Sequence, residues 1–415
     1  MIPVVAYRDL EQRLSAILNR SATFSTEIDA RVAEIIAGVR ARGDEAVLDF
    51  TERFDGVRPA TIRVGAGLLE EAYEQMDRTL REVIARAADN VRRFHVRQRR
   101  EAWIAEDGDG VVLGQRYMPL DRAGVYVPGG KAFYPSSLIM NVVPAQVAGV
   151  GEIHLVSPPQ ADGRPHPLVM ATAHFLGIEH VYAVGGAQAV AALAFGTETV
   201  QNVDKIVGPG NVYVAAAKKQ VYGPVAIDSV AGPSEIVVLA DHTADPRHVA
   251  ADLLAQAEHD ERASAVLVTT EADLAEAVRA QIDAWWPQLQ RKEILTSSLP
   301  GYSACVVVPD EQTGIDLVNR LAPEHLELIV EDPWATMGEI RHAGAIFLGP
   351  YSSEPVGDYF AGPNHVLPTG GTARYASALG VDDFIRRQSI ISYSAKRLAQ
   401  TGQDIIRFAE AEHLP

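Results

Sequence analysis

The sequence predicts an α/β fold in which two Rossmann-like domains are each built on a parallel sheet. From residue 124 onward, short apolar segments alternate with helical segments, which is typical of successive βαβ units. Glycines recur where the predicted strands end and the next helices begin. A chain of 415 residues is long enough for two or three such domains.

Helices are predicted for the N-terminal part of the chain. Residues 25–56 have apolar residues at helical spacing, with Ser25 and Thr26 as candidate caps. A second amphipathic region covers residues 68–103 and is expected to break near Asp77. Neither region concentrates chemically active side chains, so both are interpreted as scaffold.

A first α/β series follows. Its strands are predicted at residues 124–127, 153–156, 181–184, 205–207 and 225–227, and its helices at 136–147, 167–176, 188–195 and 212–221. Glycines follow three of these strands directly before helices. Ligands bind at this edge of open parallel sheets, where helix N-termini favour anions such as a pyrophosphate. No G-x-G-x-x-G fingerprint follows a strand, so the glycines are equally consistent with structural turns.

A second series completes the α/β pattern. Its strands are predicted at residues 236–239, 265–268, 305–308, 326–329 and 345–348. Asp245 and Pro246 should open one helix, as its cap and first-turn proline, and residues 271–290 form another. A loop-rich segment, 349–371, precedes a polar, mostly helical tail. The two series suggest two domains, with the first inserted into the second or preceding it.

The charge balance excludes some partners. The formal net charge of −17 disfavours binding to nucleic-acid backbones and anionic membranes. A basic run at residues 92–100 opposes this trend and is interpreted as a solvated helix face rather than a polyanion site. No apolar run approaches the ~20 residues that span a bilayer, and the N-terminus lacks the pattern of a signal peptide. A cytoplasmic location is therefore expected.

Cys305 is the single cysteine, so neither an intramolecular disulfide nor a thiolate metal cluster can form. It lies in an apolar predicted strand, which favours a buried, inert thiol. This disfavours the cysteine nucleophile that many aldehyde oxidations use.

A divalent metal site is one interpretation of three polar residues. Gln256 and His259 are three residues apart at the end of a predicted helix, which places them on one face. Asp358 could meet them in space as a third ligand. An amide oxygen, an imidazole and a carboxylate suit a hard-to-borderline divalent cation. On spacing alone, a polar helix end and a loop aspartate are the more common explanation of these residues.

A second group of residues suits acid–base chemistry. Glu324 and His325 lie between Pro323 and a predicted strand, and a carboxylate beside an imidazole can move protons near neutral pH. A surface turn would explain the same dipeptide. His365 is close enough to Asp358 in sequence to line the same cavity.

Taken together, the loops resemble histidinol dehydrogenase over nearly the whole chain. Eight short stretches carry the resemblance in order: 124–130 (GVYVPGG), 185–189 (GGAQA), 208–211 (GPGN), 231–235 (AGPSE), 256–259 (QAEH), 323–326 (PEHL), 357–359 (GDY) and 364–368 (NHVLP). Any one of them is a weak signal, but eight in order are specific.

The resemblance implies a two-step, NAD-dependent oxidation of L-histidinol through L-histidinal to L-histidine, in histidine biosynthesis. It implies one Zn²⁺ per subunit and Glu324 and His325 as the catalytic pair. The implied ligands of NAD are Tyr126, Gln188 and Asn211, and those of zinc are Gln256, His259 and Asp358. The implied substrate contacts are Ser234, Gln256, His259, His325, Asp358, His365 and Glu412.

The resemblance also implies an intertwined homodimer in which the C-terminal tail completes the partner's active site. The expected domains are an N-terminal helical arm (1–20), an α/β domain with the metal and catalytic residues (21–123 and 236–378), an inserted NAD-binding domain (124–235) and a helical tail (379–415).

One position departs from the family pattern. The family continues past a stretch like Glu412-His413-Leu414-Pro415 to a histidine that supplies a fourth zinc ligand, and this sequence stops before it. Either the given sequence is truncated, or water or another group completes the metal site, and we expect truncation to account for the difference. Three alternative functions remain open: oxidation of another small polar alcohol, a zinc hydrolase that uses Glu324 and His325 on water, and a non-catalytic relative.

Overall fold

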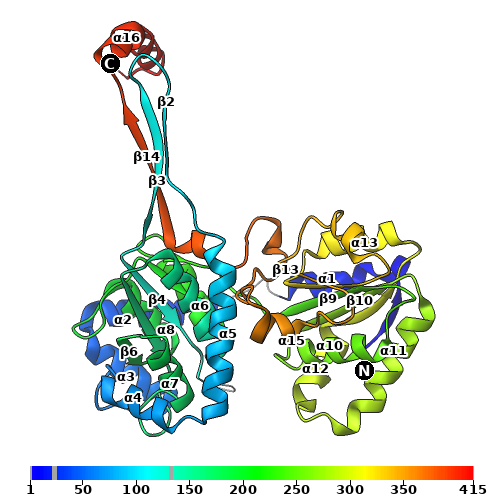
Figure 1. Cartoon of the computed structure of the whole chain (residues 1–415). Coiled ribbons are helices and arrows are strands. Elements are labelled where there is room, and N and C mark those ends of the chain that lie inside the picture. Colours follow the sequence, from blue (N-terminus) through cyan, green and yellow to red (C-terminus); the bar gives the residue numbers. More distant parts are fainter. Residues whose placement is uncertain (1, 21–25, 130–133, 415) are drawn as a thin grey trace.

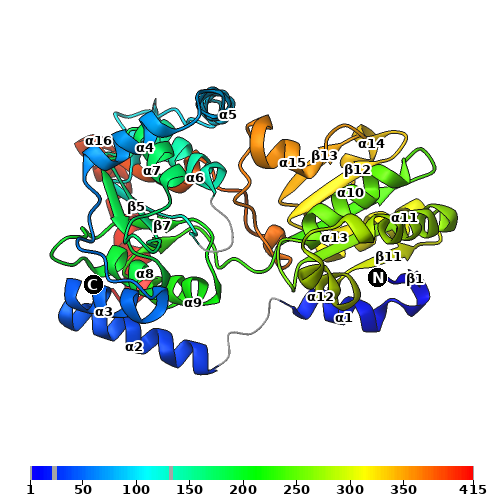
Figure 2. The same ribbon diagram turned by 90° about the horizontal axis from the view of Figure 1, so that it is seen from below.

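The computed structural model describes residues 2–20, 26–129 and 134–414, which form two α/β domains and a long projecting arm (Figure 1). The two domains lie side by side, each with its own sheet and helices (Figure 2). No helix in these described ranges has both the length and the apolar character that a membrane crossing needs.

The larger-sheet domain contains six parallel strands in the order β1-β11-β10-β9-β12-β13. The strands are β1 Val4–Ala6, β9 Glu235–Ala240, β10 Ser264–Thr269, β11 Ala304–Val307, β12 His325–Ile329 and β13 Ala345–Leu348. Alternate residues of β9 enter two apolar cores, because successive side chains of a strand point to opposite faces. One core is shared with α10 Pro246–Ala257, α11 Ala272–Trp285 and α12 Lys292–Tyr302, and the other with α1 Glu11–Asn19 and α13 Glu311–Leu321. The short helix α14 Pro333–Met337 follows β12.

The smaller-sheet domain contains five parallel strands in the order β6-β5-β4-β7-β8. The strands are β4 Arg122–Tyr126, β5 Glu152–Ser157, β6 His180–Ala183, β7 Lys205–Val207 and β8 Ala226–Ile227. One face packs against α2 Thr26–Arg42, α3 Asp44–Asp55, α8 Gly186–Phe195 and α9 Val212–Val221. The other packs against α4 Ala66–Gln75, α5 Arg78–Val96, α6 Pro135–Ala148 and α7 Pro167–Phe175.

The projecting arm is a three-stranded antiparallel sheet that ends in a helix (Figure 1). It consists of β2 Trp103–Glu106, β3 Val112–Pro119, β14 Ile385–Ser392 and α16 Ala395–Ala411. The remaining short elements are η1 Tyr7–Asp9, η2 Trp286–Gln288, α15 Glu354–Val356, η3 Gly357–Ala361, η4 Thr372–Arg374 and η5 Val381–Phe384. Because β14 lies within residues 379–415, this tail is not purely helical as predicted.

The N-terminal segment is not the separate helical arm that residues 1–20 were predicted to form. β1 pairs with β11, and Leu14 and Ile17 of α1 are buried against the larger sheet. The apolar residues of this segment are therefore core residues of the larger-sheet domain.

The helices of residues 26–96 also belong to a different domain from the one predicted. Val32 and Ile35 of α2 pack with α8 and α9 on the smaller sheet, rather than with residues 236–378. The smaller-sheet domain is thus inserted between α1 and β9, and it begins well before residue 124. Of the two predicted caps at the start of this region, Ser25 lies outside the described residues.

The predicted helix at 25–56 is two helices. Gly43 separates α2 from α3 at φ +55°, a conformation that L side chains rarely adopt. The second predicted helix ends at Val96 rather than near residue 103, because Trp103 begins β2. Its predicted break is confirmed, and Asp77 caps α5 by accepting the N–H of Leu80.

Two predictions from composition agree with the structure. Cys305 is fully buried in β11, and burial raises the pKa of its thiol to about 12. The basic run at 92–100 lies on and just after α5 with its arginines exposed, and Arg100 is paired with Asp382. The thiol is therefore inert, and the arginines form a solvated surface.

Candidate active site

A cavity of about 890 Å³ lies between the two domains. The predicted residues that line it are Tyr126, Gln188, Asn211, Ser234, Gln256, His259, Glu324, His325, Asp358 and His365. Glu412 does not, because it ends α16 at the far end of the arm (Figure 1). The structure therefore brings together every predicted site residue except one.

The two sheets present opposite edges to this cavity. The smaller sheet contributes its carboxyl edge, where Tyr126 ends β4 and the loop at 208–211 follows β7. The larger sheet contributes its amino edge, where Glu235 and His325 are the first residues of β9 and β12. The rule that ligands bind at carboxyl edges thus holds for the smaller sheet alone.

The loop from Gly208 to Asn211 is held rigidly against β4. A Cβ atom at Gly208 would lie 2.2 Å from the carbonyl oxygen of Tyr126, so only glycine fits, and its φ is +108°. Its N–H donates to Asp228 at 2.8 Å, and its carbonyl accepts from the Lys218 ammonium at 3.0 Å. Lys218 and Asp228 also pair with each other while almost fully buried. This ion pair therefore fixes both polar groups of Gly208.

The N-termini of α8 and α9 beside this loop also have polar groups that suit a ligand. The Tyr126 hydroxyl accepts the N–H of Gly186 at the start of α8 (3.0 Å), and burial raises the pKa of this phenol to about 12. Asn211 caps α9 by accepting the N–H groups of Tyr213 and Val214. Both polar atoms of the buried Gln188 amide lack a hydrogen-bond partner within the described ranges. Since an unpaired buried amide is costly, a polar ligand at this position would satisfy it.

Metal-ligating atoms converge at the other end of the site. His259 donates from Nδ1 to the carbonyl of Ala255 at 2.9 Å, which leaves Nε2 as its potential ligand atom. One ligand atom each from His259, Glu354 and Asp358 lie within 4.8 Å of one another. The Gln256 oxygen is buried and finds no partner among the described residues. Two of the three predicted ligands, His259 and Asp358, therefore meet here, Gln256 lines the same cavity, and Glu354 is a further candidate that the sequence analysis missed.

The acidity of this region favours a cation. Burial raises the pKa of Glu354, and the negative charge of Asp358 raises it further. Burial likewise raises the pKa values of Glu327 and Asp252, which lie behind Glu354. For Asp358, burial is outweighed by His325 and His365, and the pKa falls. Because so many buried carboxyl groups cannot all be charged near neutrality without compensation, a divalent cation fits the site.

Glu324 and His325 are buried, which excludes the surface-turn interpretation. The His325 ring donates from Nδ1 to the carbonyl of Glu235 at 3.1 Å. Its Nε2 has no hydrogen-bond partner in the described chain and lies 3.7 Å from an Asp358 oxygen. Burial raises the pKa of Glu324 to about 7. Burial lowers the pKa of His325, but Glu324 and Asp358 outweigh it and raise the value to about 10.

His365 lies against the same aspartate. Its Nδ1 donates to the backbone carbonyl of Asp358 at 3.0 Å, so its Nε2 accepts from the Ser137 hydroxyl at 3.2 Å. Burial lowers the pKa of His365, which favours the neutral ring. Ser137 lines the cavity as well, although the sequence analysis only placed it near the start of a helix.

Comparisons with known proteins agree with this geometry. A family model described as Histidinol dehydrogenase matches residues 18–415. Histidinol dehydrogenase from Halalkalibacterium halodurans is 54% identical over 401 residues, 96% of this chain and 95% of that protein. The Bacillus subtilis (strain 168) protein of the same name is 52% identical over 404 residues, 97% and 94% of the two chains. The crystal structure of histidinol dehydrogenase from Elizabethkingia anophelis superposes with a TM-score of 0.94 at 36% identity, covering 100% of this chain and 95% of that one.

Proposed function

Since the chain belongs to the histidinol dehydrogenase family of NAD-dependent, zinc-binding enzymes, we propose that its interdomain cavity holds NAD, zinc and L-histidinol in adjoining positions. The family reaction oxidises L-histidinol to L-histidine in histidine biosynthesis. One observation carries the proposal: the unpartnered His325 Nε2, the Asp358 carboxylate and the glycine loops all face one cavity.

Gln256, His259 and Asp358 would hold the zinc ion. Each presents a suitable atom to the cavity, and the Gln256 oxygen has no competing partner in the described part of the chain. When bound, zinc would anchor the amine and imidazole of the substrate and offset the acidic charge that raises the pKa of His325. Ser234 and His365 line the adjoining wall and would contact the substrate directly.

The smaller-sheet domain would bind NAD. The N-termini of α8 and α9 lie at the cavity and favour the negatively charged diphosphate. Tyr126, Gln188 and Asn211 would supply the polar contacts that orient the dinucleotide. The rigid Gly208 loop lets the chain backbone approach the diphosphate closely.

His325 would accept the hydroxyl proton in the first step. The O–H proton would pass to Nε2 as the alcohol is oxidised to the aldehyde, and NAD, when bound, would supply the hydride acceptor. The bond from Nδ1 to the Glu235 carbonyl fixes the tautomer, so Nε2 presents the lone pair that accepts the proton.

Glu324 would act in the second step. Its carboxylate would take a proton from water as the hydroxide adds to the aldehyde carbon, and the protonated His325 would return its proton to the aldehyde oxygen, which gives the hydrate and a neutral His325. His325 would then accept a proton from the hydrate as a second NAD oxidises it to the carboxylic acid. Because water is the nucleophile, the inert thiol of Cys305 is not required.

Replacing Gln188 with alanine is expected to raise the KM for NAD about tenfold, the effect of losing one hydrogen bond of ordinary strength. Steady-state NADH formation at saturating L-histidinol measures the change. Gln201→Ala, an exposed position in the same domain, is the matched control and should keep the native KM. Equal KM values for both variants would remove Gln188 from the NAD site.

We further propose that two chains form a homodimer through the arm. No residue of α16 is buried in the described chain, although the helix is amphipathic and exposes Leu398, Ile405 and Phe408. Exposed aromatic side chains also surround the loop that carries Asp358, including Tyr359 in the cavity wall. Such apolar surfaces are typical of contact sites between chains. The arm of one chain would bring Glu412 into the cavity of the other.

A hybrid dimer tests whether Glu412 acts on the partner's site. Homodimers of His325→Asn and of Glu412→Gln are each expected to be impaired. A hybrid of the two variants should recover about half of the native activity, because one of its sites receives an intact His325 and an intact Glu412. If Glu412 acts within its own chain, both sites of the hybrid carry a defect and no recovery occurs.

A further inference from the structure

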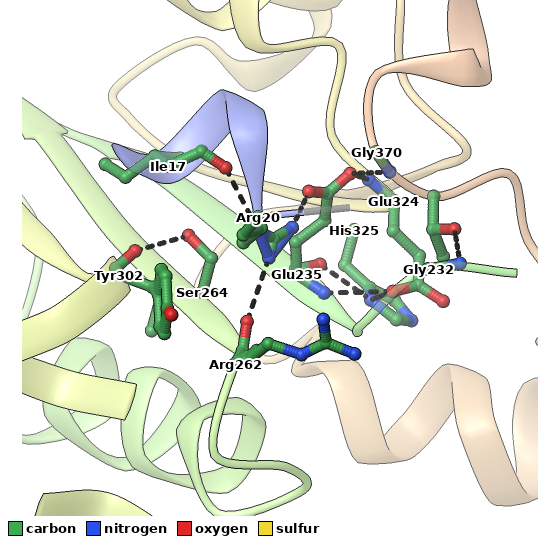
Figure 3. Close-up of polar contacts among 12 residues, drawn as sticks. Ile17, Arg20, Gly232, Glu235, Arg262, Ser264, Tyr302, Glu324, His325 and Gly370 are labelled. Atoms are coloured by element: carbon green, nitrogen blue, oxygen red, sulfur yellow. Dashed lines mark hydrogen bonds and ion pairs between the residues drawn. The ribbon is translucent and has the colours of Figure 1, made fainter. Parts of the chain in front are cut away.

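A buried ion pair connects the N-terminal segment to the proposed catalytic pair. The Arg20 side chain, directly after α1, is fully buried and pairs with a carboxylate oxygen of Glu235 (Figure 3). It also donates to the carbonyl oxygens of Ile17 at 3.2 Å and Arg262 at 3.3 Å. These contacts fix the guanidinium in one orientation, with its charge directed at Glu235.

Glu235 in turn is interlocked with Glu324. The backbone N–H of Glu235 donates to Oε2 of Glu324 at 3.0 Å, and the backbone N–H of Glu324 donates to Oε1 of Glu235 at 3.3 Å. A third donor, the N–H of Gly370, reaches the same Glu235 oxygen at 3.0 Å. Figure 3 shows the two side chains side by side at the start of β9 and β12. The backbone carbonyl of Glu235 also accepts from His325.

We propose that Glu235 is a positioning residue for both Glu324 and His325, and that Arg20 is the counter-ion that holds the Glu235 side chain in place. The inference rests on the proposed role of Glu324 as the base of the aldehyde step. Two adjacent carboxylates repel each other, so without a cation one of them would take up a proton or turn away. Arg20 supplies that cation from outside the cavity, where it cannot block the substrate.

Several charged groups face Glu324 and decide how the variants behave. His325 is the next residue, at the start of β12, and Glu235 is the first residue of β9. Glu354 and Asp358 lie on α15 and η3, and Arg20 pairs with Glu235. Burial is the main cause of the raised pKa of Glu324, and the charge of Glu235 adds to it, while His325 opposes it. Since Glu324 must be ionised to accept a proton, the aldehyde step is expected to lose activity as the pH falls through about 7.

The test compares the two steps in the full-length, zinc-loaded protein. NADH formation is measured from L-histidinol and from L-histidinal across the pH range. Arg20→Met should move the acid limb of the aldehyde step upward by about one pH unit, and Glu235→Gln should move it downward by a similar amount. Arg20→Lys, which keeps the charge, should restore most of the native profile. Glu235→Gln keeps a side-chain oxygen that can accept the N–H of Gly370. If Arg20→Met does not fold, the pH profile of Glu235→Gln therefore tests the inference by itself.

The matched control is Arg320→Met. Arg320 pairs with Glu11, so it also joins α1 to α13, but through an exposed ion pair that does not include Glu235. Its pH profile should be native. Equal losses in both steps with an unmoved acid limb would show that Arg20 and Glu235 are merely structural, and would overturn the inference.

Glu324→Gln separates the inference from the function on which it rests. If this variant oxidises L-histidinal at the native rate, the proposed role of Glu324 is wrong. If it is inactive in the aldehyde step while the Arg20 and Glu235 variants keep the native profile, the role of Glu324 stands and only the positioning inference fails.

Discussion

Replacing His325 with asparagine is expected to lower kcat for L-histidinol by about 10²–10⁴-fold, the usual contribution of a positioned general base. Asparagine can keep a hydrogen bond to the Glu235 carbonyl, but it cannot accept a proton. The KM for L-histidinol should change much less, because the proposed zinc ligands and His365 still hold the substrate. A loss that falls on kcat therefore identifies a proton acceptor rather than a binding group.

Steady-state kinetics with both substrates at saturation measure this loss. His242→Asn is the matched control, since His242 is exposed just after β9 in the same domain. It should retain the native kcat. Similar kinetics for the two variants would show that His325 does not take part in proton transfer.

The second large effect concerns the metal. Asp358→Asn removes the anionic zinc ligand itself. Loss of a residue that only contacts a ligand weakens metal binding about 10–100-fold, so a larger loss of zinc affinity is expected for this variant. Elemental analysis after dialysis should find close to one zinc per native chain and almost none in the variant. Oxidation of L-histidinol should fall in parallel.

A second cluster of potential metal-ligating side chains provides the control for the zinc measurement. Glu152, His154 and His180 also bring their potential ligand atoms within 4.8 Å. There, however, the two imidazole rings stack with centroids 4.5 Å apart, and the cationic Arg63 lies 3.4 Å from His180 Nδ1. His180→Asn should therefore keep its zinc. Zinc lost from this variant and retained by Asp358→Asn would move the metal site to the smaller sheet.

Most strands and helices of both domains could be predicted from the sequence because their side chains are buried on a regular period, although β1, α12, α13 and α14 were not. The bounds 212–221 and 345–348 agree with α9 and β13 at both ends. Asp245 caps α10 as predicted, by accepting the N–H of Arg247. Such elements are set by local chemistry and by apolar periodicity, and both are visible in the sequence.

The sequence did not show to which of the two domains helix α2 belongs. The apolar face of α2 would suit either sheet, and only the three-dimensional packing assigns it to the smaller one. The arm was missed for another reason. All residues of β2 are exposed, so the strand lacks a buried face, and β3 pairs with β14 about 270 residues later in the chain.

Some residues of the candidate site were also visible in the sequence, and others were not. The spacing of Gln256 and His259 made them candidate metal ligands, and the chemistry of Glu324 and His325 made them candidates for acid–base work. Glu354 precedes Asp358 by four residues, a spacing that could have identified it as a neighbour, but its burial was not evident from a loop-rich segment. Arg20 gave no signal, because its partner Glu235 is 215 residues away in the sequence.

The most direct test of the account measures NADH and zinc in the same sample. With a limiting amount of L-histidinol and excess NAD, the zinc-loaded protein should form two NADH for each L-histidinol consumed, with L-histidine as the product. Chelation should abolish the signal, and added zinc should restore it. One NADH with accumulating L-histidinal, or full activity in the metal-free protein, would contradict a single zinc-dependent site that performs both steps.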